Sequence, residues 1–193
     1  NVASATSEKQ RANQEIQDLL LALGVKPGKD FNPADLRYER IIVMTDADVD
    51  GAHIAALLMT FFYREMPELI AGGHLCLAVP PLYRLSQGGV TAYAIDDADR
   101  DRLLKEKFNT RGKVEISRFK GLGEMPAKQL KDTTMDPAQR VLLQVMLPDK
   151  DASAKEIKAT KDLVERLMGK KPELRFEFIR DHARFVLDKD LDI

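Results

Sequence analysis

The chain has 193 residues, of which 44% are hydrophobic and 32% are charged, and its formal net charge is −1. This composition suffices for one sizeable hydrophobic core with a small appended unit, and it excludes a surface that is basic throughout, so any contact with DNA needs local basic clusters. No apolar stretch approaches the roughly 18 to 20 residues of a membrane span, and the first residues lack the order of a signal peptide, so we expect a cytoplasmic protein without a membrane partner.

The first elements lead to a short apolar strand. A helix is expected over residues 8–23, because its apolar side chains recur on one face and Gly24 follows as a stop signal. A loop rich in proline and glycine is expected over residues 25–35. Residues 41–45 are apolar or β-branched, which is typical of a strand buried on both faces of a parallel sheet.

Three aspartates, Asp46, Asp48 and Asp50, come directly after this strand, and Gly51 follows them. Open α/β sheets form their ligand crevice at the carboxyl ends of the strands, and a glycine lets the chain turn sharply enough for at least two carboxylates to converge. At about 5 Å, with an effective dielectric constant of about 20, each pair of like charges costs roughly 3 kcal/mol. A hard divalent cation with oxygen ligands reverses that cost, so the sequence predicts a metal site here.

Two other interpretations of the acidic turn compete with a metal site. An EF-hand loop begins with the same pattern, but it requires a bidentate Glu at its twelfth position, where this chain has Leu57. In an ordinary strand-to-helix turn, Asp50 would cap a helix that begins near Gly51, and the other acids would be solvated. A cap needs one acid whereas this turn has three, so we favour the metal site.

The middle of the chain continues the alternation of helices and strands. Apolar side chains at helical spacing predict a long helix over residues 52–70, which Pro67 bends or ends. Residues 75–79 form a second buried strand, which contains the single cysteine of the chain, expected to be a small buried thiol in a reducing compartment. A glycine turn predicts a hairpin between residues 82–85 and 90–95.

A basic glycine turn follows the next strand. We expect a charged helix over residues 97–108 and a strand over residues 113–119, and the turn Lys120-Gly121-Leu122-Gly123-Glu124 comes after it. Its glycines let backbone amides approach a phosphate, and Arg118 and Lys120 add positive charge. Alone this signal is weak, because a solvated glycine turn between a strand and a helix has the same composition.

The last part of the chain is expected to be helical. Asp136 and Pro137 form a helix-start signal, which predicts a helix over residues 136–146. Two further helices are expected over residues 155–168 and 173–187. The expected architecture is therefore an α/β domain over residues 1–148, with a mostly parallel sheet flanked by helices and incomplete at its N-terminus, and a helical tail over residues 149–193.

Three long strings resemble one family almost without a break. They are LRYERIIVMTDADVDGAHIAALLMTFFYREMPELI, PPLYRL and RFKGLGEMPAKQLKDTTMDP, and they resemble the TOPRIM portion of the B subunit of bacterial type IIA DNA topoisomerases. Within that family, the compact run QGGVTAYAIDDADRDRLL is more similar to the topoisomerase IV type than to the gyrases that carry a large insertion. Primases and nucleases share the acidic cluster, but the surrounding strings do not resemble theirs.

The resemblance implies roles for the acidic and basic residues. Asp46 and Asp48 are the leading Mg²⁺ ligands and catalytic residues, Asp50 is a further or water-mediated ligand, and Mn²⁺ or Ca²⁺ are substitutes for Mg²⁺. His53 would donate to a phosphate oxygen during catalysis, while Lys120 and Arg118 would contact the DNA backbone. The ion would act in the cleavage and religation of double-stranded DNA by a tyrosine of the partner A subunit, giving decatenation and relaxation of supercoils.

The resemblance also implies partners and further domains. The family works as an A2B2 heterotetramer on the chromosome, and ATP is bound by an N-terminal domain outside this sequence. The family motif Glu-Gly-Asp-Ser is also absent from it, so we expect a piece of a longer subunit that by itself binds Mg²⁺ weakly and cleaves no DNA. A DNA gyrase B subunit is the alternative within the family. An alternative of another class is a non-catalytic module, in which the acidic turn holds a structural ion and the glycine turn binds a protein partner.

Overall fold

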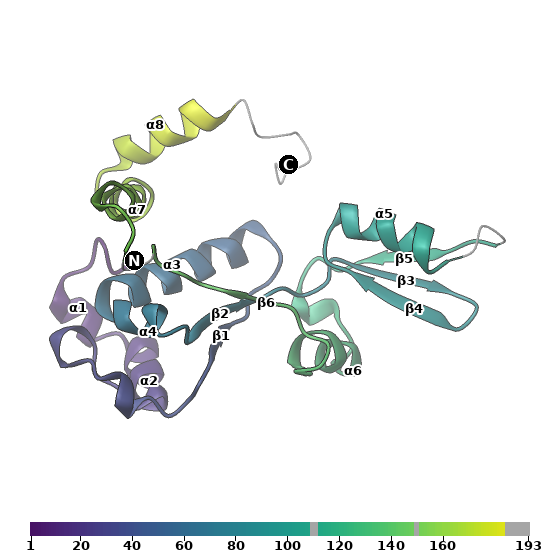
Figure 1. The fold of residues 1–193 in the computed structure, drawn as a ribbon, viewed down its shortest axis with the longest axis horizontal. Helices are drawn as coiled ribbons and strands as arrows, with labels where there is room; N and C mark the ends of the chain where they lie inside the picture. Colours follow the sequence, from purple (N-terminus) through teal and green to yellow (C-terminus); the bar gives the residue numbers. More distant parts are fainter. Residues whose placement is uncertain (109–111, 149–150, 184–193) are drawn as a thin grey trace. The chain divides into compact units, whose positions relative to one another are not determined.

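The computed structural model describes residues 1–108, 112–148 and 151–183 (Figure 1). Its α-helices are α1 (Ser7–Arg11), α2 (Gln14–Leu23), α3 (Val49–Glu65), α4 (Pro67–Ala71), α5 (Asp97–Glu106), α6 (Ala127–Leu130), α7 (Ala154–Met168) and α8 (Pro172–His182). Its strands are β1 (Ile41–Val43), β2 (Leu75–Ala78), β3 (Tyr83–Gln87), β4 (Val90–Ala94), β5 (Glu115–Arg118) and β6 (Leu142–Gln144). Among the described residues, no helix is both long enough and apolar enough to cross a membrane.

The described residues form two compact units, each assembled from separate stretches of the chain. The first unit takes residues 1–41 and 56–75 together with the described part of 145–193, and the second takes residues 42–55 and the described part of 76–144. The acidic turn, the hairpin and the glycine turn all belong to the second unit. The division expected at residue 148 stays a prediction.

The α/β class is confirmed, but the sheets are smaller and more antiparallel than the mostly parallel sheet that the sequence predicts. One sheet has the order β1-β2-β6 and the other has the order β4-β3-β5. The pairs β2–β6, β3–β4 and β3–β5 are all antiparallel. The hairpin explains one of these pairs, because Gly88 (φ 56°) and Gly89 (φ 87°) adopt the positive φ angles of a tight turn that reverses the chain.

The helices expected near the N-terminus and after the acidic turn are each divided. The helix expected over residues 8–23 is interrupted because the side chain of Asn13 accepts a hydrogen bond from the Ile16 amide and so caps α2. The helix expected over residues 52–70 begins earlier, at Val49, and Pro67 starts the separate helix α4. Proline has no amide hydrogen, so it fits the first turn of a helix better than its interior.

The prediction of a helix over residues 136–146 is wrong. Only a turn follows Asp136, whose carbonyl oxygen accepts the Arg140 amide at 2.8 Å, and residues 142–144 form β6 instead. Strand β6 pairs with β2 in the register Cys76 with Gln144 and Ala78 with Leu142. The hydrogen bonds of this ladder outweigh a local helix-start signal that is worth about 1 kcal/mol.

The two C-terminal helices are confirmed within the described residues. The side chain of Ser153 accepts from the Glu156 amide, and the Glu156 carboxylate accepts in return from the Ser153 amide, which forms a capping box at the start of α7. Hydrogen bonds from the backbone and side chain of Ser153 hold the pKa of Glu156 below its usual value. Helix α8 ends at His182, and the expected continuation over residues 184–187 lies outside the described residues.

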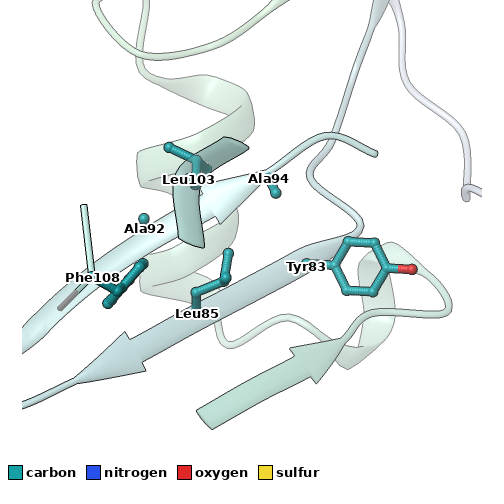
Figure 2. Close-up of a cluster of buried hydrophobic side chains, with 6 residues drawn as sticks. All are labelled: Tyr83, Leu85, Ala92, Ala94, Leu103 and Phe108. Atoms are coloured by element: carbon teal, nitrogen blue, oxygen red, sulfur yellow. The ribbon is translucent and has the colours of Figure 1, made fainter. Parts of the chain in front are cut away.

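Helix α5 covers one face of the hairpin and closes a core there (Figure 2). Alternate residues of β3 and β4 point towards the helix, where they pack with Leu103 of α5 and with the following Phe108. The buried cluster consists of Tyr83, Leu85, Ala92, Ala94, Leu103 and Phe108. This core supports β3, whose other neighbour is β5, the strand that leads to the glycine turn.

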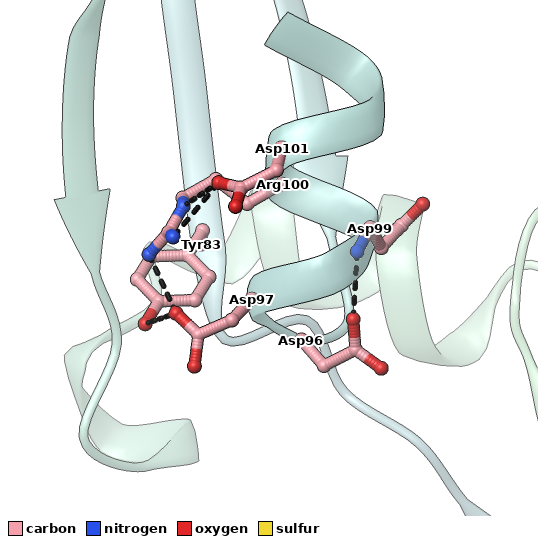
Figure 3. A network of polar contacts seen from close by, with 6 residues as sticks. All are labelled: Tyr83, Asp96, Asp97, Asp99, Arg100 and Asp101. Atoms are coloured by element: carbon pink, nitrogen blue, oxygen red, sulfur yellow. Dashed lines mark hydrogen bonds and ion pairs between the residues drawn. The ribbon is translucent and has the colours of Figure 1, made fainter. Parts of the chain in front are cut away.

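A polar network at the start of α5 fixes the buried ring of Tyr83 (Figure 3). The Tyr83 hydroxyl donates to Asp97 at 2.9 Å, and the Arg100 guanidinium lies 5.0 Å from the centre of the ring. Arg100 also pairs with Asp101 at 2.8 Å, and this hydrogen bond raises the pKa of the guanidinium above its usual value. Tyr83 is thus a packing residue of the hairpin core, held in place by its hydroxyl contact with Asp97.

Replacement of Tyr83 by Phe removes the hydroxyl and keeps the ring. We expect the free energy of unfolding to fall by about 1 kcal/mol, because one partly buried hydrogen bond is lost. Tyr93→Phe on the adjacent strand β4 is the matched control, because the Tyr93 hydroxyl has no hydrogen bond within the described residues. Urea unfolding monitored by circular dichroism measures both variants, and equal stability of the two would contradict the importance of the Tyr83 contact.

Candidate metal centre

Asp46 lies three residues after β1, and its carboxylate reaches a distant part of the chain. Its Oδ1 accepts a hydrogen bond of 2.7 Å from the backbone amide of Leu122, although the two residues are 76 positions apart. Both residues belong to the second unit. A carboxylate oxygen has two lone pairs, so Asp46 keeps Oδ2 and part of Oδ1 for another ligand. The Asp46 side chain is exposed, as a residue that receives a ligand from solvent must be.

Asp48 caps the helix that begins at the next residue. Its Oδ1 accepts from the Gly51 amide at 2.7 Å, and its carbonyl oxygen accepts from the Ala52 amide at 3.0 Å. The capping interpretation of this turn is therefore right about the geometry but wrong about the residue, which is Asp48 rather than Asp50. A single cap uses one carboxylate oxygen, so Oδ2 of Asp48 remains available to a cation.

Asp50 and His53 lie on the first turns of α3 and both are exposed. Their spacing of three residues places them on the same side of the helix. Neither side chain has a hydrogen bond within the described residues. They are therefore available to solvent or to a ligand, next to the positive end of the helix dipole, which favours a bound anion.

Gly51 is required by a very close approach of the chain to itself. A Cβ atom at this position would lie 2.1 Å from the carbonyl oxygen of Asp46 and 2.9 Å from its backbone nitrogen. The first turn of α3 therefore passes directly against the backbone of Asp46, and Gly51 is buried there. This contact brings the start of the helix and the Asp46 peptide into one compact turn.

The glycine turn lies against the acidic turn. Its Leu122 amide is the donor to Asp46, and the amide of Lys120 donates to the Glu124 carboxylate at 2.8 Å. The side chains of Lys120 and Arg118 are exposed on the same segment. The sequence suggests that the amides of this turn meet a phosphate, whereas in the structure one of them meets a carboxylate.

The donor set of the acidic turn fits a magnesium ion that keeps most of its waters. Within the described residues, no three His, Cys, Asp or Glu side chains are close enough together to hold a metal ion. Asp46 and Asp48 each direct one carboxylate oxygen to a backbone amide, which leaves the other oxygen of each for a ligand. Magnesium is commonly bound by one or two carboxylates together with waters and substrate phosphates, so two aspartates are a sufficient protein shell. The assignment of Asp46, Asp48 and Asp50 as ligands stays a prediction.

Two contacts of the site had no signal in the sequence. Nothing in the local pattern links Leu122 to Asp46, and the pairing of Glu124 with the Lys120 amide is likewise visible only in the structure. The one available signal was topological, because both turns follow predicted strands, and ligand crevices form where strand ends meet.

The chain is similar to known proteins along its whole length. Residues 2–78 match the family model of the Toprim domain, and residues 111–180 match that of the DNA gyrase B subunit, carboxyl terminus. The chain is 61% identical over its whole length to the DNA topoisomerase 4 B subunit of Caulobacter vibrioides, and 57% identical over 99% of its length to that of Bartonella bacilliformis. It is 47% identical over its whole length to the DNA gyrase B subunit of Halalkalibacterium halodurans. The chain spans 27% to 29% of the length of these relatives.

Proposed function

Because this chain belongs to the family of Toprim-containing B subunits of bacterial type IIA DNA topoisomerases, we propose that it supplies the magnesium site of a topoisomerase IV. The activity of the whole enzyme would be ATP-dependent decatenation of DNA and relaxation of supercoils. The observation that most supports a reactive site here is the meeting of two turns, where exposed Asp46 accepts from the Leu122 amide of the glycine turn and exposed Asp48, two residues further along, accepts from the Gly51 amide. A turn that only began a helix would need the Asp48 cap alone.

Some residues of this site would bind the metal ion and others would bind the DNA. Asp46 and Asp48 would hold the ion, and Asp50 would hold one of its waters. A bound Mg²⁺ supplies electrostatic stabilisation of the oxygen that leaves the phosphodiester and of the charge on the phosphate. The exposed cations Lys120 and Arg118 would bind the DNA backbone, and His53 at the start of α3 would donate a hydrogen bond to a phosphate oxygen.

The nucleophile and the ATP site lie on other parts of the proposed assembly. A tyrosine of the partner A subunit would attack the phosphodiester, and two A and two B subunits would act together on double-stranded DNA of the chromosome. ATP would bind to another domain of the B subunit. The identity to topoisomerase 4 subunits reaches 61%, against 47% for the gyrase subunit of Halalkalibacterium halodurans, which favours the topoisomerase IV assignment.

Metal removal tests the proposed function directly. The complete A2B2 enzyme is stripped with EDTA and then titrated with Mg²⁺, Mn²⁺ or Ca²⁺ while DNA cleavage and supercoil relaxation are measured on gels. We expect no cleavage without a divalent ion, and recovery with Mg²⁺ or Mn²⁺, because two carboxylates with waters suit both ions. DNA binding at fixed ionic strength is the control, and it should survive chelation, because Lys120 and Arg118 need no metal. Cleavage in EDTA would contradict the proposal.

A further inference from the structure

The contact between Asp46 and the glycine turn does more than join two loops. The Leu122 amide fixes one oxygen of the Asp46 carboxylate at 2.7 Å. Rotation of the carboxylate would break this hydrogen bond, so the direction of Oδ2 is fixed as well. A carboxylate on an exposed loop otherwise samples several rotamers, and a ligand must then restrict it at an entropic cost.

A side chain at Gly121 would crowd the Asp46 carboxylate. A Cβ atom at Gly121 would lie 3.0 Å from Cγ of Asp46, 3.1 Å from Oδ1 and 3.3 Å from Oδ2. The backbone of Gly121 is extended, with φ −161° and ψ 172°, which any residue adopts. The backbone conformation therefore does not call for glycine, but the nearby carboxylate favours it, because an added Cβ atom would push the carboxylate by a few tenths of an ångström. By contrast, a Cβ atom at Gly123 in the same turn would meet no atom within 4 Å.

The turn itself is held at both ends. At its start, the Phe119 amide donates to the Leu82 carbonyl oxygen at 2.9 Å, and the Phe119 side chain is buried. At its end, Met125 is buried as well. Between them, the Glu124 carboxylate accepts from the Lys120 amide at 2.8 Å and closes the turn on itself. These contacts therefore hold in place the segment whose Leu122 amide donates to Asp46.

We infer that the turn of residues 120–124 is a positioning element for Asp46, with Gly121 as its critical residue and Glu124 as its brace. This inference rests on the proposed function, since the positioned group is the proposed magnesium ligand. Groups that hydrogen-bond to a metal ligand orient it, and their loss commonly weakens metal binding by about 10- to 100-fold. Gly121→Ala is thus expected to weaken metal binding without removing any ligand.

The test measures metal affinity separately from activity. Gly121→Ala, Gly123→Ala and Asp46→Asn are made in the complete A2B2 enzyme, and Mn²⁺ binding is titrated by electron paramagnetic resonance of the free ion. We expect a Kd for Mn²⁺ about 10-fold higher in Gly121→Ala and unchanged in Gly123→Ala. Circular dichroism confirms that each variant is folded. An equal Kd in the two glycine variants, both folded, would overturn the positioning role.

A second pair of variants separates the effect of the Glu124 hydrogen bond from the effect of the Glu124 charge. Glu124→Ala removes the acceptor for the Lys120 amide and should raise the Kd for Mn²⁺ in the same direction as Gly121→Ala. Glu124→Gln keeps an acceptor oxygen but removes the charge, so it should restore the wild-type Kd. If Glu124→Gln weakens Mn²⁺ binding as much as Glu124→Ala, the effect is one of charge, and the bracing role is overturned.

Asp46→Asn distinguishes this inference from the proposed function. Wild-type Mn²⁺ affinity in Asp46→Asn would defeat both the proposed function and the inference that depends on it. Loss of Mn²⁺ binding in Asp46→Asn, together with wild-type binding in Gly121→Ala, would defeat only the positioning role.

Discussion

Replacement of Gly51 by Ala is expected to disrupt the acidic turn and to reduce DNA cleavage by the assembled enzyme about 100-fold. The added methyl group would lie 2.1 Å from the Asp46 carbonyl oxygen, and this obstacle is backbone that cannot rotate away. Gly51 lies within α3, so alanine gains about 1 kcal/mol of helix propensity. Overpacking costs about 1 to 3 kcal/mol, and a backbone clash this close falls at the upper end, so the clash outweighs the gain.

The effect on cleavage follows from the displacement of Asp46. Relief of the overlap requires a shift of the Asp46 peptide of about 1 Å, and misplacement of a catalytic group on that scale costs about 100-fold in rate. DNA cleavage at saturating Mg²⁺ and the midpoint of urea unfolding are the two measurements. Gly123→Ala is the matched control, because a methyl group there meets only open space. Wild-type stability and cleavage in Gly51→Ala would contradict the close packing of this turn.

Asp48→Asn is expected to reduce magnesium-dependent cleavage strongly while leaving the fold intact. Asparagine keeps the oxygen that accepts from the Gly51 amide, and it caps helices as well as aspartate does, so stability should change little. The variant loses the negative charge that would bind the ion. Loss of one strong electrostatic contact at a reacting centre costs roughly 10²- to 10³-fold in rate, and we expect a loss of that order.

Asp48→Ala separates the two roles of this residue. It removes both the charge and the cap, so cleavage should fall as in Asp48→Asn and the free energy of unfolding should fall by about 1 kcal/mol as well. Supercoil relaxation and thermal unfolding of both variants measure these effects. Nearly normal relaxation by Asp48→Asn would favour the non-catalytic binding module over the enzyme.

Local patterns predicted the parts of the fold that local chemistry determines. The apolar run before the acidic turn predicted β1, although the strand ends at Val43. The pair Gly88-Gly89 predicted the hairpin, because few other residues adopt its positive φ angles. The apolar spacing after Ser153 predicted α7, and its capping box explains where the helix begins.

Contacts between distant residues decided what the sequence could not predict. The segment 142–144 carries helix-compatible residues, yet pairing with β2 makes it a strand. The hydrogen bond between Leu122 and Asp46 depends on how two turns meet, and no periodicity encodes that meeting. The sequence therefore indicated candidate ligands, whose assignment stays a prediction, but it did not indicate their supporting contacts, which only the folded chain brings together.

The most direct test of the central claim is the position of a bound ion. Crystals of the complete A2B2 enzyme with DNA, grown with Mn²⁺, give an anomalous difference map that locates the metal independently of activity. We expect a peak about 2.1 Å from a carboxylate oxygen of Asp46 and of Asp48, next to a DNA phosphate. A well-occupied manganese peak elsewhere in the complex, with no density between these two aspartates, would contradict it.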